Sequence, residues 1–291
     1  MKKTLIRISL SILVSGLVIY GCKKDKKDDV ATTQDTDTQT AQDNSLAEGT
    51  YNDVNNIANE AMENQTSLST YRTGHDPANI MSACATVTLT PNVPPTPGGI
   101  IVVNFGTTPC LCSDLRYRKG IINVAYSGMY RDSATVIGIT FNNYYVGRDI
   151  SNMYKVMGTK TITNTGHNAA GHTVFSINVN GSLLNNSGQT MTWNSQRTRE
   201  WIAGESTVGN WIDDEYKING SANGTSFAGN SYSINISQAL HISLNCRWIE
   251  DGKFEFTPSG KPTRYVDYGT GGCDNIATVT ISGYVFNIVL P

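Results

Sequence analysis

The amino terminus lacks a hydrophobic run long enough for a spanning helix. Such a helix needs roughly 20 apolar residues, whereas the apolar stretch 8–19 is interrupted by serine and glycine and ends before Cys22. Basic residues precede this stretch, namely Lys2, Lys3 and Arg7. The layout predicts an export signal over residues 1–21 that is removed from the mature chain. An uncleaved anchor and plain secretion are the alternatives.

The chain also lacks an excess of charge of one sign. Its formal net charge is -2 and its pI is about 6.1, with the arginines dispersed along the sequence. No basic field is therefore present to attract the phosphate backbone, and nucleic acid is excluded as a partner. The local basic cluster, residues 116–119, is interpreted as a solvated strand edge.

Motifs for nucleophilic catalysis are missing. There is no G-x-S-x-G elbow, and the four histidines stand in no signature with a serine or cysteine nucleophile. His167 and His172 flank a probable turn at residues 168–171, so we interpret them as solvated loop residues and not as metal ligands. A thiolate site at Cys110 and Cys112 is disfavoured by their single intervening residue. No catalytic residue, cofactor or metal is predicted.

Paired carboxylates could serve a glycosidase, and the densest acidic cluster in the body of the chain is residues 213–215. On a strand, only Asp213 and Glu215 would share a face, because neighbouring side chains point in opposite directions. With no second acid opposite them, we interpret the cluster as a wet edge beside Trp211. A glycosidase-like enzyme is therefore the third functional hypothesis.

The cysteine after the export signal identifies its class. Residues 19–22, Ile-Tyr-Gly-Cys, resemble the lipobox of bacterial lipoproteins, in which the cysteine is acylated and becomes the first residue of the mature chain. The resemblance implies lipidation at Cys22 and a membrane partner held through that lipid. Lys27, Asp28 and Asp29 resemble the tags that export lipoproteins of the Bacteroidota to the outer face of the outer membrane. Surface exposure is thus expected over a periplasmic location.

The segment after the lipidated cysteine is short of apolar and aromatic residues. Residues 22–50 are therefore expected to form a disordered, charged and polar linker. A short helix is predicted over residues 52–64, within a lead-in of residues 51–70, because apolar residues recur there at helical spacing. Its acids, Asp53 and Glu60 among them, are interpreted as the wet face of the helix.

From about Cys84 onward the hydrophobic pattern has a period of two, with glycine at nearly every turn. This predicts a single all-β domain over residues 71–291, an antiparallel meander forming a sandwich or barrel-like sheet. A two-residue loop at Ser282 and Gly283 predicts the register of the last hairpin. Its predicted partners are Ile281 with Tyr284, Val279 with Phe286 and Ala277 with Ile288. Asn-Gly pairs at 180–181, 219–220 and 223–224 are further hairpin signals.

Besides Cys22, the cysteines are Cys84, Cys110, Cys112, Cys246 and Cys273. Disulfides persist in an exported protein. Proximity along the chain predicts Cys84 bonded to Cys110 or to Cys112, and Cys246 bonded to Cys273. Each bond closes a loop of roughly 25 residues and stabilises the fold by ~3 kcal/mol.

All four tryptophans fall in the later half of the chain, and core packing is the expected role for most of them. Trp201 is the candidate exception, because it follows a polar run that contains Arg197 and Arg199. If exposed on a strand edge, these three residues could bind a glycan or a peptide.

Four blocks of the sequence carry a family resemblance. They are ACATVTLT, CSDLRYRKGIINVAYSGMY, TWNSQRTREW and YGTGGCDNIATVT, spread over roughly residues 84–290. They resemble a family of uncharacterised all-β lipoproteins of the Bacteroidota, a resemblance that implies no activity. The leading hypothesis is therefore a noncatalytic, lipid-anchored protein of the outer membrane with a structural role or an interaction with another envelope protein. A glycan- or peptide-binding module is the second.

Overall fold

The computed structural model describes residues 35–63, 80–81, 84–91, 97–207 and 210–290. Within these residues the regular elements are, in order: α1 (Gln39–Glu63), β1 (Thr86–Pro91), β2 (Gly99–Asn104), β3 (Cys110–Leu111), β4 (Tyr117–Tyr126), β5 (Val136–Asp149), β6 (Asn152–His167), β7 (Thr173–Leu184), β8 (Thr190–Ala203), the short 3₁₀ helix η3 (Trp211–Asp213), β9 (Glu215–Thr225), β10 (Ser231–Ser243), β11 (Asp251–Pro258), β12 (Arg264–Thr270), β13 (Ile276–Ile281) and β14 (Tyr284–Val289).

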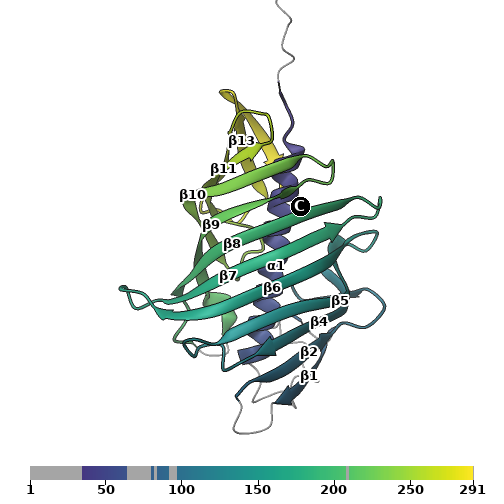
Figure 1. The fold of residues 1–291 in the computed structure, drawn as a ribbon, viewed down its shortest axis with the longest axis vertical. Coiled ribbons are helices and arrows are strands. Elements are labelled where there is room, and N and C mark those ends of the chain that lie inside the picture. Colours follow the sequence, from purple (N-terminus) through teal and green to yellow (C-terminus); the bar gives the residue numbers. More distant parts are fainter. Residues whose placement is uncertain (1–34, 64–79, 82–83, 92–96, 208–209, 291) are drawn as a thin grey trace, which may run out of the picture. The chain divides into compact units, whose positions relative to one another are not determined.

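The described strands form one 14-stranded antiparallel sheet in which almost every strand pairs with its neighbours in sequence (Figure 1). Only β3 lies off this path, against β4, and β1 and β14 are the two ends of the strand order. The predicted antiparallel all-β meander is therefore confirmed. Register shifts, such as those between Thr140 and Tyr145 in β5 and between Asn235 and Leu240 in β10, mark irregularities where these long strands can bend.

The last hairpin has the predicted register. Ile281 pairs with Tyr284, Val279 with Phe286 and Ala277 with Ile288. The turn is made by Ser282 and Gly283, both with positive φ, as a two-residue loop of this kind requires.

The three Asn-Gly pairs were misleading as turn signals. Residues 180–181 lie inside β7, and residues 219–220 and 223–224 lie inside β9. At Gly181 the reason is close packing against the helix, because a Cβ there would lie 2.0 Å from the Tyr51 hydroxyl oxygen. The glycine thus marks a place where the sheet and α1 touch directly and not a chain reversal.

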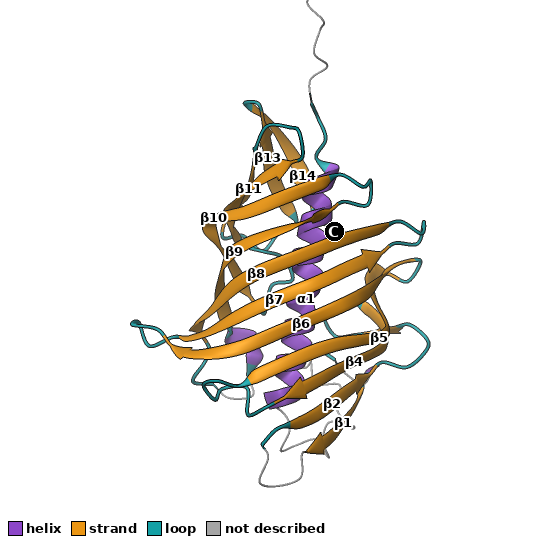
Figure 2. Ribbon diagram, viewed as in Figure 1, coloured by secondary structure: helices purple, strands orange, loops and turns teal. Residues whose placement is uncertain are grey.

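The helix α1 runs along the sheet, and the strands cross its axis (Figure 2). Most of its described side chains are buried, including Ala47, Val54 and Ile57. The amino-terminal half hydrogen-bonds to β14 through Gln42, whose side chain donates to the Val289 carbonyl at 3.1 Å. Because α1 contacts β2 near one end of the strand order, β8 in its middle and β14 at its other end, the sheet curves around the helix.

The predicted linker is wrong from residue 39 onward. Residues 39–50 are helical and belong with the strands to one unit that starts at Thr36, and the predicted helix over 52–64 is only the second half of α1. The polar composition predicted too little apolar burial to offset the conformational entropy lost when the segment becomes ordered. The sheet instead supplies buried hydrogen-bond and ion-pair partners for these polar groups. The export signal, Cys22 and residues 64–70 of the predicted lead-in lie outside the described residues.

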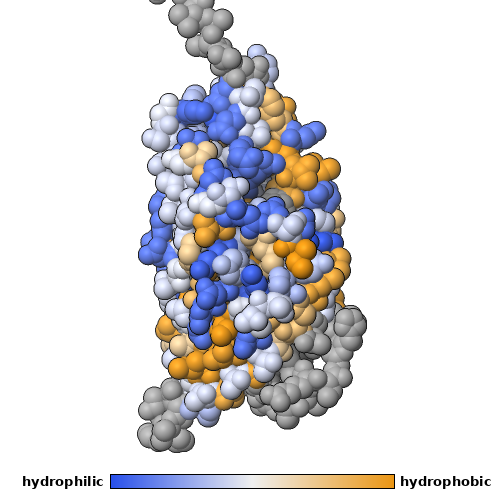
Figure 3. All heavy atoms as spheres, turned by 90° about the vertical axis from the view of Figure 1, so that its right-hand side faces the viewer, coloured by the Kyte–Doolittle hydropathy of each residue, from blue (hydrophilic) through white to orange (hydrophobic). Residues whose placement is uncertain are grey.

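The face of the sheet turned toward α1, which we call the inner face, carries the core. Side chains alternate along the strands, so that Phe175, Ile177 and Val179 of β7 point inward while Asn178 and Asn180 are exposed. One face of the molecule shows hydrophilic and hydrophobic residues interspersed, with hydrophobic clusters at its upper right and lower left (Figure 3). In the described part of the chain, α1 included, we find no helix with the length and apolar character needed to cross a membrane.

Candidate functional site

Buried cations on the inner face pair with acids of α1. Arg197 of β8 and Glu48 lie 2.5 Å apart (Nη2 to Oε2), and both side chains are 3% exposed. Arg118 of β4 and Asp53 lie 2.6 Å apart (Nη2 to Oδ1). Burial of an unpaired charge is costly, so each residue of a pair permits the other to be buried. These ion pairs explain how a polar helix can lie against a sheet.

Two further basic residues of the inner face contact α1. The ammonium of Lys160 donates to the backbone carbonyl of Tyr51 at 2.7 Å, and burial, together with the nearby charge of Arg199, lowers the pKa of Lys160. The Arg199 guanidinium donates to the side-chain oxygen of Asn56 at 3.0 Å. The inner face of the sheet is therefore basic where it meets the helix.

The predicted binding residues are part of this interior. Trp201 is 1% exposed, Arg197 is 5% exposed and Arg199 is 1% exposed. The expectation of an exposed strand edge is therefore wrong. In a strand, residues two apart share a face, so Arg197 and Arg199 point inward with Trp201. The polar partners of both arginines come from α1, and that of Arg197, Glu48, lies in the segment predicted as a disordered linker.

The predicted solvated faces were also wrong in two places. Asp53 and Glu60 of α1 are buried, where a wet helix face was expected. Arg118, in the basic cluster at residues 116–119, is fully buried, where a solvated strand edge was expected. Asp53 and Arg118 face each other across the interface between helix and sheet, and Glu60 accepts a hydrogen bond from the backbone N–H of Ile80 at 3.0 Å.

One histidine contacts the acidic cluster through Glu215, but the two candidate acids of the cluster do not come together. His172 lies 2.7 Å from Glu200 (Nδ1 to Oε1), and His241 lies 3.1 Å from Glu215 (Nε2 to Oε2). Asp213 instead accepts a hydrogen bond from the Thr207 hydroxyl at 2.9 Å. Asp213 and Glu215 therefore face different partners and form no carboxylate pair.

Asp214, between those two acids, is the buried member of the cluster. The Trp201 indole donates to its Oδ1 at 3.2 Å, and the Tyr216 hydroxyl donates to its Oδ2 at 3.2 Å. Burial raises the pKa of Asp214 to about 7. The group therefore changes charge near neutral pH.

Both predicted disulfides form, and the open choice falls on Cys110. Cys84 bonds to Cys110, and Cys246 bonds to Cys273. Cys112 is a buried free thiol, and burial raises its pKa to about 11. Glu250 lies beside the Cys246–Cys273 sulfurs, but a disulfide offers no thiolate to a metal ion.

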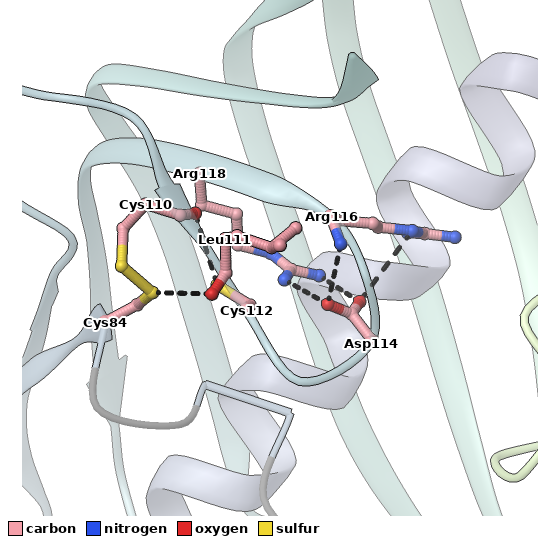
Figure 4. Close-up of a disulfide and its surroundings, with 7 residues drawn as sticks. All are labelled: Cys84, Cys110, Leu111, Cys112, Asp114, Arg116 and Arg118. Carbon is pink, nitrogen blue, oxygen red and sulfur yellow. Dashed lines mark hydrogen bonds and ion pairs between the residues drawn. A yellow bond between two sulfur atoms is a disulfide. The ribbon is translucent and has the colours of Figure 1, made fainter. Parts of the chain in front are cut away.

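The first disulfide adjoins a turn that carries paired charges (Figure 4). In this turn, residues 112–116, the Asp114 carboxylate accepts two hydrogen bonds from Arg118, at 2.7 and 2.6 Å. Arg116, from the same turn, lies 3.1 Å from Asp53 (Nη1 to Oδ1). Asp114 and Asp53 thus neutralise Arg118 and Arg116.

Beside α1 lies a cavity of about 740 Å³, which we call the helix-side cavity. One side of α1 lines it, including Leu46, Gly49 and Asn52. Its other walls are the turn 112–116, the end of β5 with the start of β6, η3, the loop from β10 to β11 and the Cys246–Cys273 disulfide. A volume of this size is typical of small-molecule binding sites.

Three arginines line the helix-side cavity: Arg116, Arg148 and Arg247. The guanidinium carbons of Arg148 and Arg247 lie 4.8 and 4.6 Å from the ring centroid of Trp248, and Arg116 donates to the backbone carbonyl of Arg247 at 3.5 Å. Burial, together with the charges of Arg116 and Arg247, lowers the pKa of Arg148 to about 10. The arginines are therefore close enough to oppose one another's charge.

Apolar and aromatic side chains form much of the rest of the wall. The loop that carries Arg247 and Trp248 also contributes Leu244 and Ile249, and Ile242 lies at the adjoining end of β10. Sequence reasoning missed the cavity. The adjacency of arginine and tryptophan at residues 247–248 is the one local signal that could have indicated it, because this pair resembles a common binding-surface composition.

Comparisons with protein-family models, curated proteins and solved structures find no match. The described chain is thus a predominantly antiparallel β protein with a buried polar helix and a cavity beside that helix. Function is inferred below from the residues of that cavity.

Proposed function

We propose that this chain is a noncatalytic, lipid-anchored protein of the outer membrane, exposed at the cell surface, that binds a ligand in the helix-side cavity. The observation that carries the binding role is the cavity of about 740 Å³ with Trp211, Trp248 and three arginines in its wall. We thus favour a binding module over a purely structural role. The ligand-binding residues are those of the cavity wall and not the predicted group around Trp201.

A disulfide and ion pairs hold the wall of the cavity in place, which favours a binding site that is formed before the ligand arrives. The Cys246–Cys273 disulfide joins the loop from β10 to β11 to the connection between β12 and β13. On the opposite side, Asp53 of α1 is held by Arg118 and Arg116. A binding site held in place before the ligand arrives loses less conformational entropy on binding.

The composition of the wall supports binding without chemistry. The described histidines, residues 167, 172 and 241, lie outside the wall. Of the lining acids, Asp53 and Asp114 are engaged by arginines, and Asp149 accepts a hydrogen bond from the backbone N–H of Ser151. General acid–base catalysis needs a group free to exchange a proton with the substrate. The lining residues instead offer aromatic rings, apolar side chains and fixed positive charge.

The anchor and the location are supported by the sequence. The export signal, the lipobox-like residues 19–22 and the tag-like residues 27–29 lie in this order, ahead of Thr36, where the folded unit starts. Labelling cells with an alkyne-tagged palmitate should mark the wild-type protein and leave Cys22→Ala unmarked. Protease treatment of intact cells should digest the protein while a periplasmic control survives. Survival of both proteins would contradict surface exposure.

Binding in the cavity is tested by filling it. Gly49 lies on the cavity side of α1 with nothing within 4 Å of the position of a Cβ, so Gly49→Leu adds a side chain there and also favours the helix. Gly138 of β5 is equally open but lies outside the lining residues, which makes Gly138→Leu the matched control.

The probes are short oligosaccharides, short peptides and dodecyl amphiphiles below their micelle concentration, titrated by calorimetry. We expect at least one class to bind the wild type and Gly138→Leu, and to bind Gly49→Leu at least about tenfold more weakly. Equal binding to Gly49→Leu, or no binding by any class, would contradict the proposal.

A further inference from the structure

The charges around the helix-side cavity do not balance locally. The lining acids are Asp53, Asp114 and Asp149. Asp53 and Asp114 are held by Arg118 and Arg116, and exposed Asp149 accepts a hydrogen bond from the backbone N–H of Ser151 at 2.9 Å.

Arg148 and Arg247 are left without an acid partner among the described residues. Each guanidinium lies over the Trp248 ring. Its edge, which carries the N–H donors, has no protein acceptor among the described residues and is open to a ligand or to water. Two adjacent guanidiniums repel each other, so an arrangement that keeps them together is stabilised by an anion that accepts from both.

Unpaired donors around the same cavity are a second, independent observation. Within the described residues, buried polar atoms without a partner occur in four lining side chains that can donate: Asn52 Nδ2, Ser113 Oγ, Trp211 Nε1 and Trp248 Nε1. Buried donors left unpaired cost free energy. These donors belong to lining side chains but have almost no accessible surface, so an anionic group in the cavity, which only accepts hydrogen bonds, can engage them only after a change of side-chain rotamer.

The neighbouring wall is apolar. Leu244 and Ile249 flank Arg247 and Trp248 in the same loop, and Ile242 precedes them at the end of β10. A free inorganic anion would leave this apolar surface unused. A ligand with an acidic end and an apolar body would use both parts of the wall.

We propose that Arg148, Arg247 and Trp248 bind the anionic headgroup of an amphiphile, a phosphate, sulfate or carboxylate, whose apolar chain lies along Ile242, Leu244 and Ile249. This inference rests on the proposed function, since it assigns the chemistry of a ligand to the same cavity. The headgroup accepts charge-assisted hydrogen bonds from both guanidiniums. The chain removes apolar surface of the cavity wall from water.

The test compares three probes by calorimetry, all below micelle concentration. Dodecyl phosphate carries both features, tetraethylene glycol monododecyl ether carries the same chain with a neutral head, and inorganic phosphate carries the anion alone. We expect dodecyl phosphate to bind at least about tenfold more tightly than either of the others. We also expect its affinity, and not that of the neutral ether, to fall as salt rises.

The variants Arg148→Gln and Arg247→Gln should each weaken dodecyl phosphate at least about tenfold and leave the neutral ether unchanged. Lys217→Gln removes a positive charge from an exposed position of β9 and should change neither probe. Arg247 is itself exposed, so its variant is expected to fold normally.

The outcomes separate the two proposals. In one outcome, the two dodecyl probes bind with equal affinity, keep that affinity in the arginine variants and lose it in Gly49→Leu. That result would overturn the role of an anionic headgroup and leave the cavity as the binding site. Inorganic phosphate binding as tightly as dodecyl phosphate would overturn the amphiphile. If no probe binds the wild type, the inference fails, and oligosaccharide or peptide binding that Gly49→Leu weakens would still uphold the cavity.

Discussion

Arg197 and Glu48 form an ion pair in the interior, with the guanidinium and carboxylate 2.5 Å apart and both side chains 3% exposed. It joins the middle of the sheet to the half of α1 that the sequence predicts as part of a disordered linker. The polar helix is thus an interior element whose charged side chains are matched by the sheet.

Removing one member of this pair should be strongly destabilising. We expect Glu48→Gln to lower the free energy of unfolding by about 3 kcal/mol, because Arg197 would remain buried without its counter-charge. Urea unfolding followed by circular dichroism measures the change. The exposed pair Lys253 and Asp267, 2.7 Å apart, is the control, and Asp267→Asn should cost less than about 1 kcal/mol. Similar costs at the two sites would contradict a structural role for the interior pairs.

Arg148 should behave in the opposite way. Its lowered pKa means that the folded state disfavours the charged guanidinium, so Arg148→Gln is expected to raise the free energy of unfolding by about 1 kcal/mol. Arg118→Gln, which leaves Asp53 and Asp114 buried without their main partner, should instead lower it by about 3 kcal/mol. Thermal melts of the two variants give both values. A large loss of stability in Arg148→Gln would show that this arginine is held for the fold and not for a ligand.

Asp214 should make stability depend on pH near neutrality. Its pKa is raised to about 7 in the folded state, so between its ordinary value and 7 the folded state binds more protons than the unfolded state. Stability from this group is therefore present at low pH and is lost as pH rises through 7. The surrounding groups are Arg199, Asp213, Tyr216 and Trp201.

Asp214→Asn keeps an oxygen that can accept from the indole but cannot ionise. We expect the difference in unfolding free energy between pH 5 and pH 8 to shrink by on the order of 2 kcal/mol in this variant. Denaturant unfolding at the two pH values measures it. An unchanged difference would mean that Asp214 titrates at its ordinary value.

Cys112 should be inert in the folded protein. Because burial raises its pKa to about 11, almost no thiolate exists at pH 8, and the side chain is 2% exposed. In a Cys22→Ala background, Ellman's reagent should report no thiol in the native state and one thiol after unfolding without reductant. Rapid reaction of the native protein would show that the turn 112–116 opens.

Some of the fold follows from local sequence. The hairpin of β13 and β14 could be predicted to the residue, because its alternating apolar side chains allow a single register around Ser282 and Gly283. Proximity along the chain predicted the Cys246–Cys273 disulfide and left the partner of Cys84 open between Cys110 and Cys112. The Asn-Gly pair at 180–181 misled because its glycine is required by contact with Tyr51, a tertiary cause that has no local signature.

The first half of α1 and the site could not be predicted for the same physical reason. Residues 39–50 carry few apolar side chains. Their helix is stabilised by polar contacts with β8, where Arg197 pairs with Glu48 and the Trp193 indole donates to Asn44. Arg148 lies near the end of β5 and Arg247 in the loop from β10 to β11, far apart in sequence, and only the fold of the sheet brings both onto Trp248. Long-range pairing of this kind leaves no periodic pattern.

The location of a bound amphiphile tests the central claim most directly. A dodecyl phosphate with a diazirine in its chain can be photolysed on the full protein and the labelled peptides mapped by mass spectrometry. The account predicts labels on cavity segments, above all residues 242–249 and the cavity side of α1, and their loss in Gly49→Leu. Labels confined to the exposed apolar residues of β12 to β14, such as Tyr265, Ile276 and Val285, would contradict it.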